Sequence, residues 1–134
     1  DLLSEESRTT LAVNPLRVLD SSREADADLV AAAPSMLDHL SDDAEAHFGR
    51  VTDALDALGV PFTVSPHLVR GLDYYVRTTF EFVAEALDAA QDAVGGGGRY
   101  DGLAEDLGAP ATPGVGFALG VDRTLLACDA EGVF

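Results

Sequence analysis

The first 60 residues distribute hydrophobic and polar positions with the period of a helix. The clearest run follows Ser41, which can cap a first turn that holds Asp42 and Asp43. Its apolar positions recur at spacings of 4, 3, 4 and 3 residues, on one face of a predicted helix: Ala44, Phe48, Val51, Leu55 and Leu58. Gly59 and Pro61 are expected to end it.

Two shorter helices are predicted before this one. Ser4 can cap a helix whose first turn holds Glu5 and Glu6, and the Asn14-Pro15 pair interrupts it. A second helix is expected to reach about Ala33, before Pro34. Its candidate caps are Asp20, Ser21 and Ser22.

After Pro61 the pattern changes to short runs of β-branched and aromatic residues. Strands are predicted at 62–64, 74–83 and 115–119, and helices at 99–107 and 121–128. Residues 84–93 are expected to connect two strands as a hairpin, with a helical turn. The chain thus predicts an α+β protein, with a boundary near residues 59–67.

Composition limits the class of protein. The 134 residues are 47% hydrophobic, which favours a folded core over disorder. No apolar run reaches the roughly 18 residues that span a membrane, and no secretory signal is visible. The single Cys128 excludes an internal disulfide and suits a reducing cytoplasm. Because the chain begins with Asp1, it is expected to be part of something longer.

The net charge of −16 argues against a surface that attracts nucleic acid at long range. All eight basic residues are Arg, and the acidic residues are spread along the chain. A nucleic-acid partner would therefore need local Arg clusters or a basic surface elsewhere. The Asp- and Ala-rich bias fits either a GC-rich genome or adaptation to salt.

Three segments carry candidate chemistry. The segment from Arg70 to Tyr75 is either a pocket for an anion and an aromatic amine or a turn with a surface Arg. Gly95 to Gly98, followed by Arg99 and Tyr100, either lets the backbone approach a ligand or forms a flexible linker.

The third segment runs from Gly114 to Arg123. Its glycines are spaced wrongly for a dinucleotide-binding fingerprint, since Gly120 comes one residue late. Without that fingerprint, the segment is a strand that contains glycines and leads into a helix with Arg123. A flat base can lie against such a strand, and the Arg can stack on it or hold a phosphate.

Other common sites are not indicated. His39, His47 and His67 share no metal-ligand spacing, so no protein metal site is predicted. The chain has no Lys, which excludes a Lys-containing phosphate loop, and it has no Gly-x-Ser-x-Gly nucleophile elbow.

Together and in this order, the three segments resemble the histidyl-tRNA synthetases. Residues 68–75 look like the first histidine-specific motif of that family, 97–103 like the second, and 114–123 like motif 3 of class II synthetases. Residues 14–20 are similar to a stretch of the bacterial and archaeal insertion domain. The resemblance implies a helical insertion segment at 1–62. It also implies the C-terminal half of a catalytic domain at 63–134, with an antiparallel sheet flanked by helices.

The resemblance also implies roles for single residues. Arg70 would stabilise charge between the histidine carboxylate and the α-phosphate of ATP. Histidine would also contact Tyr75, Gly97, Gly98 and Tyr100. ATP would contact Gly120 and Arg123, and Mg²⁺ is expected with it. Four further residues match the family pattern and are expected to have a structural role or to support the residues that contact the ligands: Asp73, Arg77, Glu81 and Arg99.

The family reaction is the ATP-dependent activation of histidine and its transfer to histidine tRNA. The expected setting is the cytoplasm, with a homodimer as the full-length enzyme and no membrane. Motifs 1 and 2 and the anticodon-binding domain have no counterpart here, so the chain alone is expected to be inactive in tRNA charging. Two alternatives remain: a non-catalytic regulatory subunit of ATP phosphoribosyltransferase, or a piece that only binds ATP or histidine. Arg70 and Arg123 favour the synthetase over the regulatory subunit.

Overall fold

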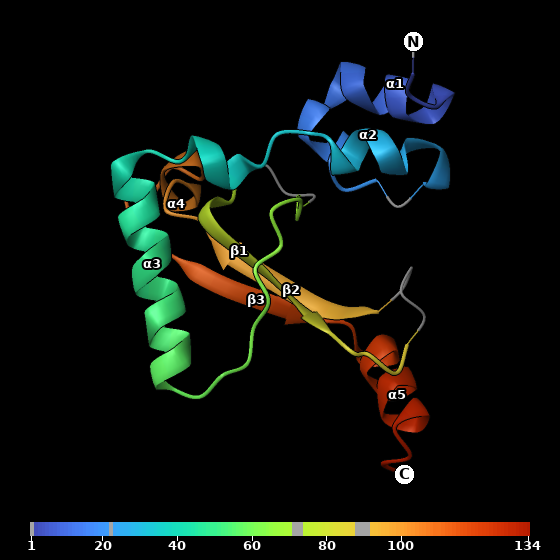
Figure 1. Cartoon of the computed structure of the whole chain (residues 1–134). Coiled ribbons are helices and arrows are strands. Elements are labelled where there is room, and N and C mark those ends of the chain that lie inside the picture. The colour runs from blue at the N-terminus through green and yellow to red at the C-terminus, as the bar shows by residue number, and fades with distance from the viewer. Residues whose placement is uncertain (1, 22, 71–73, 88–91) are drawn as a thin grey trace. The chain divides into compact units, whose positions relative to one another are not determined.

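The computed structural model describes residues 2–21, 23–70, 74–87 and 92–134. The chain forms two compact units, Asp1–Gly71 and Leu72–Phe134. The first unit holds helices and the second holds a sheet (Figure 1). The assignment of residues 1–62 and 63–134 to an insertion segment and a catalytic half-domain stays a prediction.

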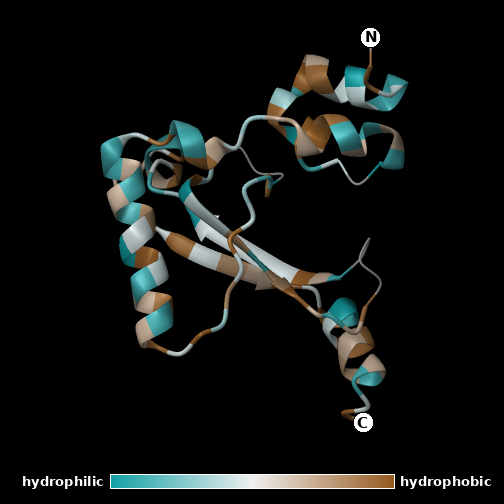
Figure 2. Ribbon diagram, in the orientation of Figure 1, coloured by the Kyte–Doolittle hydropathy of each residue, from teal (hydrophilic) through white to brown (hydrophobic). Residues whose placement is uncertain are grey.

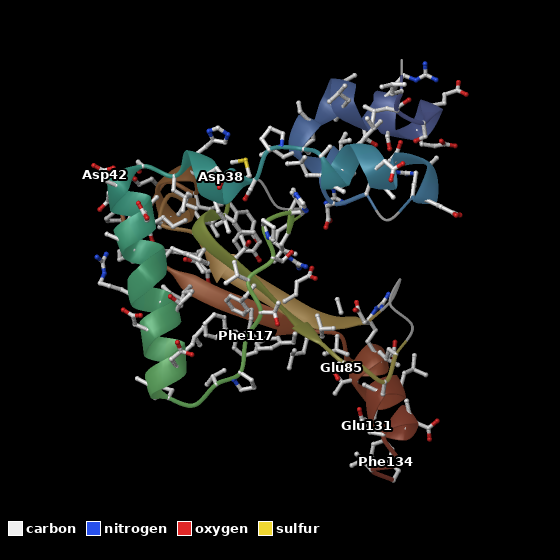
Figure 3. The ribbon with its side chains drawn as sticks, viewed as in Figure 1. Asp38, Asp42, Glu85, Phe117, Glu131 and Phe134 are labelled. Atoms are coloured by element: carbon white, nitrogen blue, oxygen red, sulfur yellow. The ribbon has the colours of Figure 1, made fainter. Side chains whose placement is uncertain are left out.

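The first unit consists of short helical segments and one long helix. In chain order they are α1 (Glu5–Val13), η1 (Pro15–Val18), η2 (Glu24–Asp26), α2 (Ala27–Ala31), η3 (Met36–His39) and α3 (Asp42–Ala57). Two predicted caps are confirmed, because the hydroxyl of Ser4 accepts from the Ser7 amide and that of Ser41 from the Ala44 amide. Figure 2 shows the alternation of hydrophobic and hydrophilic residues along α3, and Figure 3 places Asp42 at its start.

A buried carboxylate, rather than an apolar cluster, joins α1 to η2. Asp26 is fully buried and accepts hydrogen bonds from the amide and hydroxyl of Ser4, at 2.8 and 2.9 Å, and from the hydroxyl of Ser7 at 2.5 Å. The hydroxyl of Ser21 also donates to it, at 3.3 Å. Among the described residues, Val18 is the one buried hydrophobic side chain. Polar contacts therefore position these segments.

The Asp26 contacts explain one incorrect prediction. The expected helix to Ala33 begins later, as η2 followed by the five-residue α2. Arg23, not Asp20 or Ser21, is the residue before its first turn, and Ser22 lies outside the described residues. The Ser21 hydroxyl faces Asp26 instead of capping a helix. The predicted strand at 62–64 is also wrong, since those residues have no regular structure.

The second unit contains an antiparallel sheet in the order β1-β2-β3. Its strands are β1 (Val76–Val83), β2 (Ala93–Arg99) and β3 (Val115–Leu119), with α4 (Leu103–Asp106) between β2 and β3 and α5 (Val121–Ala130) after β3. The predicted strand at 115–119 and the helix after it are confirmed. Figure 3 shows Glu131 and Phe134 beyond the far end of α5.

Two predictions for this unit are wrong. Of the two alternatives for the four glycines, the flexible linker is wrong, because they form the middle of the central strand β2. The approach of their backbone to a ligand stays a prediction. The helix predicted at 99–107 is reduced to α4, because Arg99 still pairs with Val76 and Val115 in the sheet. The hairpin connection between β1 and β2 is confirmed, and its residues 88–91 lie outside the described part.

The register gives the sheet two different faces. Gly95 and Gly97 lie opposite Phe82 and Phe80 on one side and Leu119 and Phe117 on the other. Because β2 has no side chains there, the Phe82 and Phe117 rings meet across it, at 5.7 Å and 80°. We call this side the phenylalanine face and the opposite side, which carries Gly96 and Gly98, the glycine face.

Candidate functional site

Three tyrosines gather at one end of the glycine face. Tyr74 and Tyr75 immediately precede β1, and Tyr100 immediately follows β2. Their ring centroids lie 5.0 Å apart for Tyr74–Tyr75, 5.9 Å for Tyr74–Tyr100 and 6.5 Å for Tyr75–Tyr100. The chain contains three tyrosines and no tryptophan, so this group, the tyrosine cluster, holds every tyrosine of the protein.

Glycines make room for these rings. A Cβ on Gly98 would lie 2.6 Å from Cδ1 of Tyr75, and one on Gly114 would lie 2.5 Å from Cε2 of Tyr100. A Cβ on Gly116, which pairs with Gly98, would lie 2.5 Å from the Tyr100 hydroxyl oxygen. The rings of Tyr75 and Tyr100 therefore lie directly against the backbones of β2 and β3.

The environment changes the acidity of one phenol. Burial, followed by the neighbouring Tyr75, raises the pKa of Tyr74 above its usual value of 10.0. The hydrogen bond to Tyr75 and the charge of Tyr100 raise this pKa further. The cluster presents hydroxyl groups on flat rings, which suits a heteroaromatic ring with polar nitrogens.

Beside the cluster, the Nε of Arg99 donates to Oδ2 of Asp101 at 2.8 Å. This hydrogen bond is the largest cause that holds the pKa of Asp101 below its usual value. The charge of Arg99, the amide of Gly114 and the charge of Arg77 lower it as well, against the effect of burial. Asp101 is therefore ionised at neutral pH.

Gly120 and Arg123 lie at the other end of β2. The amide of Gly120 donates to the carbonyl of Val94 at 2.8 Å, which continues the β2–β3 pairing. A Cβ on Gly120 would lie 3.5 and 3.7 Å from Cβ and Cγ of Arg123, so the Arg123 stem crosses this glycine. Gly98 lies four positions after Val94 along β2, or about 13 Å at strand geometry.

The structure brings together three of the predicted histidine-site residues, namely Tyr75, Gly98 and Tyr100. Gly97 faces the other way, toward Phe117. Arg70 belongs to the first unit, while the remaining predicted residues belong to the second. Asp73 lies outside the described residues. Glu81 pairs with Gly96 and so lies on the glycine face, and Arg77 lies at a β-bulge of β1.

The sequence interpretation gave no role to several residues of this site. They are Tyr74, Asp101, Gly114 and Gly116. Tyr74 adjoins Tyr75, but alternation along a strand would have placed the two on opposite faces. Both residues precede β1, so alternation does not apply to them.

The described residues contain no cluster of side chains suited to bind a metal ion. No group of three or more His, Cys, Asp or Glu side chains among them could hold a metal ion. Within the same residues, no helix has the length and apolar character needed to cross a membrane.

The antiparallel sheet with its helices has the fold of a class II aminoacyl-tRNA synthetase, as the match to a solved synthetase shows. The apo Staphylococcus aureus histidyl-tRNA synthetase superimposes with a TM-score of 0.65 at 38% identity, over 97% of this chain and 31% of that one. The family model for histidyl-tRNA synthetase matches residues 2–124. The chain belongs to the histidyl-tRNA synthetase family.

Curated relatives agree with this assignment. The histidine–tRNA ligase of Rhodococcus opacus is 59% identical over 130 residues, and that of Nocardia farcinica is 58% identical over 130 residues. Both alignments cover 97% of this chain, but only 30% and 31% of the relatives. The chain thus spans about a third of the length of the proteins it matches.

Proposed function

We propose that this chain forms part of the histidine-activating site of a histidine–tRNA ligase. The observation that carries the proposal is the arrangement of the glycine face. It has a cluster of phenols at one end of β2, and Gly120 with Arg123 about 13 Å away at the other. Histidine and ATP joined through the α-phosphate need two such ends, one for an imidazole and one for an adenine.

At the first end, the substrate imidazole lies among the tyrosine rings. Tyr75 and Tyr100 offer hydroxyl groups that can donate to or accept from the two ring nitrogens. Gly98 leaves room for the ring of Tyr75, since a side chain at this position would collide with it. Gly97 contributes through its backbone, as part of the same strand.

At the second end, Gly120 leaves room for the adenine. Arg123 lies in the first turn of α5 beside it, where a guanidinium can stack on the base or reach the γ-phosphate. This residue is exposed, so a nucleotide can approach it.

The reaction needs no enzyme nucleophile. A carboxylate oxygen of histidine attacks the α-phosphorus of ATP, the new P–O bond forms, and pyrophosphate leaves with the electrons of the broken bond. Arg70 stabilises the negative charge that develops, because its guanidinium holds two oxygens and stays protonated. A hydroxyl group at the 3′ end of histidine tRNA then attacks the carbonyl carbon of the histidyl-adenylate, the new ester bond forms, and AMP leaves.

Mg²⁺ belongs to the proposal as the companion of ATP. The described residues do not provide a set of protein ligands for it. Such an ion is held largely by phosphate oxygens and water. We therefore assign no step to it.

The partners and setting follow from the same proposal. They are histidine, ATP and histidine tRNA, with a homodimer as the full-length state and the cytoplasm as the compartment. The net charge of −16 requires that the tRNA be held through local arginines or through a surface outside this chain.

The test is ATP–pyrophosphate exchange on the 134-residue chain, with each amino acid supplied separately. Exchange with histidine alone is expected if the chain retains adenylation. Arg70→Ala should then lower the rate by about 100-fold, as the loss of a charge-stabilising group does. Arg50→Ala, which removes an exposed Arg from α3, is the control. Exchange with another amino acid, or a normal rate in Arg70→Ala, would contradict the proposal.

A second candidate is a unit that binds histidine or ATP without chemistry. The share of the relatives that the chain covers, 30%, favours it. Histidine binding without exchange would support this candidate. The complete loss of histidine and ATP binding would contradict both.

A further inference from the structure

Asp101 occupies an unusual position next to the tyrosine cluster. Asp101 follows Tyr100 directly in the chain. Its carboxylate accepts a hydrogen bond from Arg99, the residue that directly precedes Tyr100. The two charged residues therefore bracket Tyr100 in the chain. Both side chains are about one-third exposed, at 34% and 35%. Ion pairs with that much exposure contribute little to stability, so the pair calls for another explanation.

The first strand also contributes charge to Asp101. Arg77 has a φ of +63°, the one positive φ among the described residues other than glycine. It lies where the β1–β2 register shifts between Val76 and Thr79, which marks a β-bulge. A β-bulge changes the direction of the side chains that it carries. A left-handed backbone conformation is uncommon for an Arg, so the surroundings must stabilise it. The charge of Arg77 acts on Asp101 from β1, as Arg99 does from β2.

The third strand meets the same segment. The amide of Tyr100 donates to the Gly114 carbonyl at 2.8 Å, one residue before β3. The Tyr100 ring lies on Gly114 and reaches Gly116 with its hydroxyl. The orientation of this ring therefore depends on how the turn after β2 is held against the start of β3.

We infer that Asp101 is a positioning residue, which holds the turn after β2 so that the Tyr100 ring lies on Gly114 and Gly116. It does so through its ion pair with Arg99, the last residue of β2, which pairs with Val115 at the start of β3. The consequence for histidine binding rests on the proposed function. The effect on the Tyr100 ring does not.

The chain is well suited to a direct test. Every tyrosine belongs to the cluster and there is no tryptophan, so the near-UV circular dichroism of tyrosine reports on this cluster alone. Asp101→Asn should reduce that band about twofold relative to the control Glu105→Gln. The control removes an exposed carboxylate four residues away, on α4. Each variant is also made in a Tyr100→Phe background, as a double-mutant cycle.

If Asp101 acts through Tyr100, Asp101→Asn should change the band in the Tyr100→Phe background no more than the control does. An unchanged band in Asp101→Asn alone would overturn the inference. So would a change of equal size in both backgrounds, because Asp101 would then act on the whole unit. If Asp101→Asn loses its far-UV signal, Arg99→Gln replaces it. Arg99→Gln should reproduce the loss of the band, and the absence of any effect would overturn the inference.

Histidine titration of the same variants, followed by tyrosine fluorescence, gives the functional readout. Asp101→Asn should weaken histidine binding by up to about tenfold if Tyr100 contacts the substrate, as the loss of one hydrogen bond does. A wild-type chain that does not bind histidine would count against the proposed function. The double-mutant cycle would still decide the role of Asp101.

Discussion

The two units of this chain use opposite means to bring their segments together. In the first unit, a fully buried carboxylate, Asp26, collects hydrogen bonds from Ser4, Ser7 and Ser21. In the second unit, the central strand brings its neighbours together by having no side chains, and the rings of Phe82 and Phe117 meet across it.

The two units should therefore lose stability for different reasons. A carboxylate that accepts several hydrogen bonds is sensitive to protonation and to the loss of any donor. A glycine strand is indifferent to pH but tolerates no added atom where the neighbouring backbone is close. Since all tyrosines lie in the second unit, tyrosine fluorescence follows that unit, while far-UV helix signal is dominated by the first.

The largest effect is expected from Gly97→Ala. The new Cβ would overlap the carbonyl oxygen of Gly116 and lie 2.7 Å from Cβ of Phe117. Backbone cannot move aside as a flexible side chain can, so we expect a loss of about 3 kcal/mol in unfolding free energy. Urea unfolding followed by tyrosine fluorescence measures it. Gly102→Ala, which meets nothing within 4 Å, is the matched control. Equal stability of the two variants would refute the packing argument.

The next effect concerns the first unit and acid. Hydrogen bonds from the Ser4 amide and the Ser7 hydroxyl lower the pKa of Asp26 from 3.8 to about 2. Between these values the unfolded chain binds more protons than the folded one. The stabilisation is therefore complete above pH 4 and is lost as the pH falls toward 2. Helix signal should fall in this window before tyrosine fluorescence changes.

Asp26→Asn tests the cause of that acid transition. The variant should lower the melting temperature of the helix signal by roughly 5 °C or more at neutral pH, and it should lack the loss between pH 4 and 2. Asp28→Asn, on the exposed side of α2, should behave as wild type. An acid transition that survives in Asp26→Asn would assign it to other carboxylates.

A smaller effect separates the two capping serines. Ser41→Ala removes the acceptor for the Ala44 amide alone and should cost about 1 kcal/mol. Ser4→Ala removes a cap and also a donor to Asp26, so it should cost more. Thermal unfolding followed by far-UV circular dichroism compares them. Equal losses would mean that the Ser4–Asp26 bond contributes nothing measurable.

The smallest effect has the opposite sign. Gly49 lies inside α3 with nothing within 4 Å of an added Cβ. Gly49→Ala should stabilise the first unit by about 0.5–1 kcal/mol, because alanine loses less backbone entropy in a helix. The same substitution at Gly97 destabilises the second unit. A destabilised Gly49→Ala in thermal unfolding would contradict this contrast.

Elements that depend on neighbouring residues in the chain could be predicted from the sequence alone. The caps Ser4 and Ser41, the period of α3 and the β-branched run of β1 each act within a few residues, so each could be predicted. The motif order 68–75, 97–103 and 114–123 also determined the family, which the matches to known synthetases confirm.

Features that depend on contacts between residues far apart in the chain became visible only in the tertiary structure. Four glycines have poor intrinsic preference for a strand, and only the pairing with β1 and β3 made them one. The expected helix at Arg99 was shortened because the same pairing continues through that residue. Gly114 and Gly116 became part of the tyrosine site because the β2–β3 register places them beneath Tyr100. Asp26 was unremarkable in the sequence, and its burial arises from serines 5 to 22 residues away.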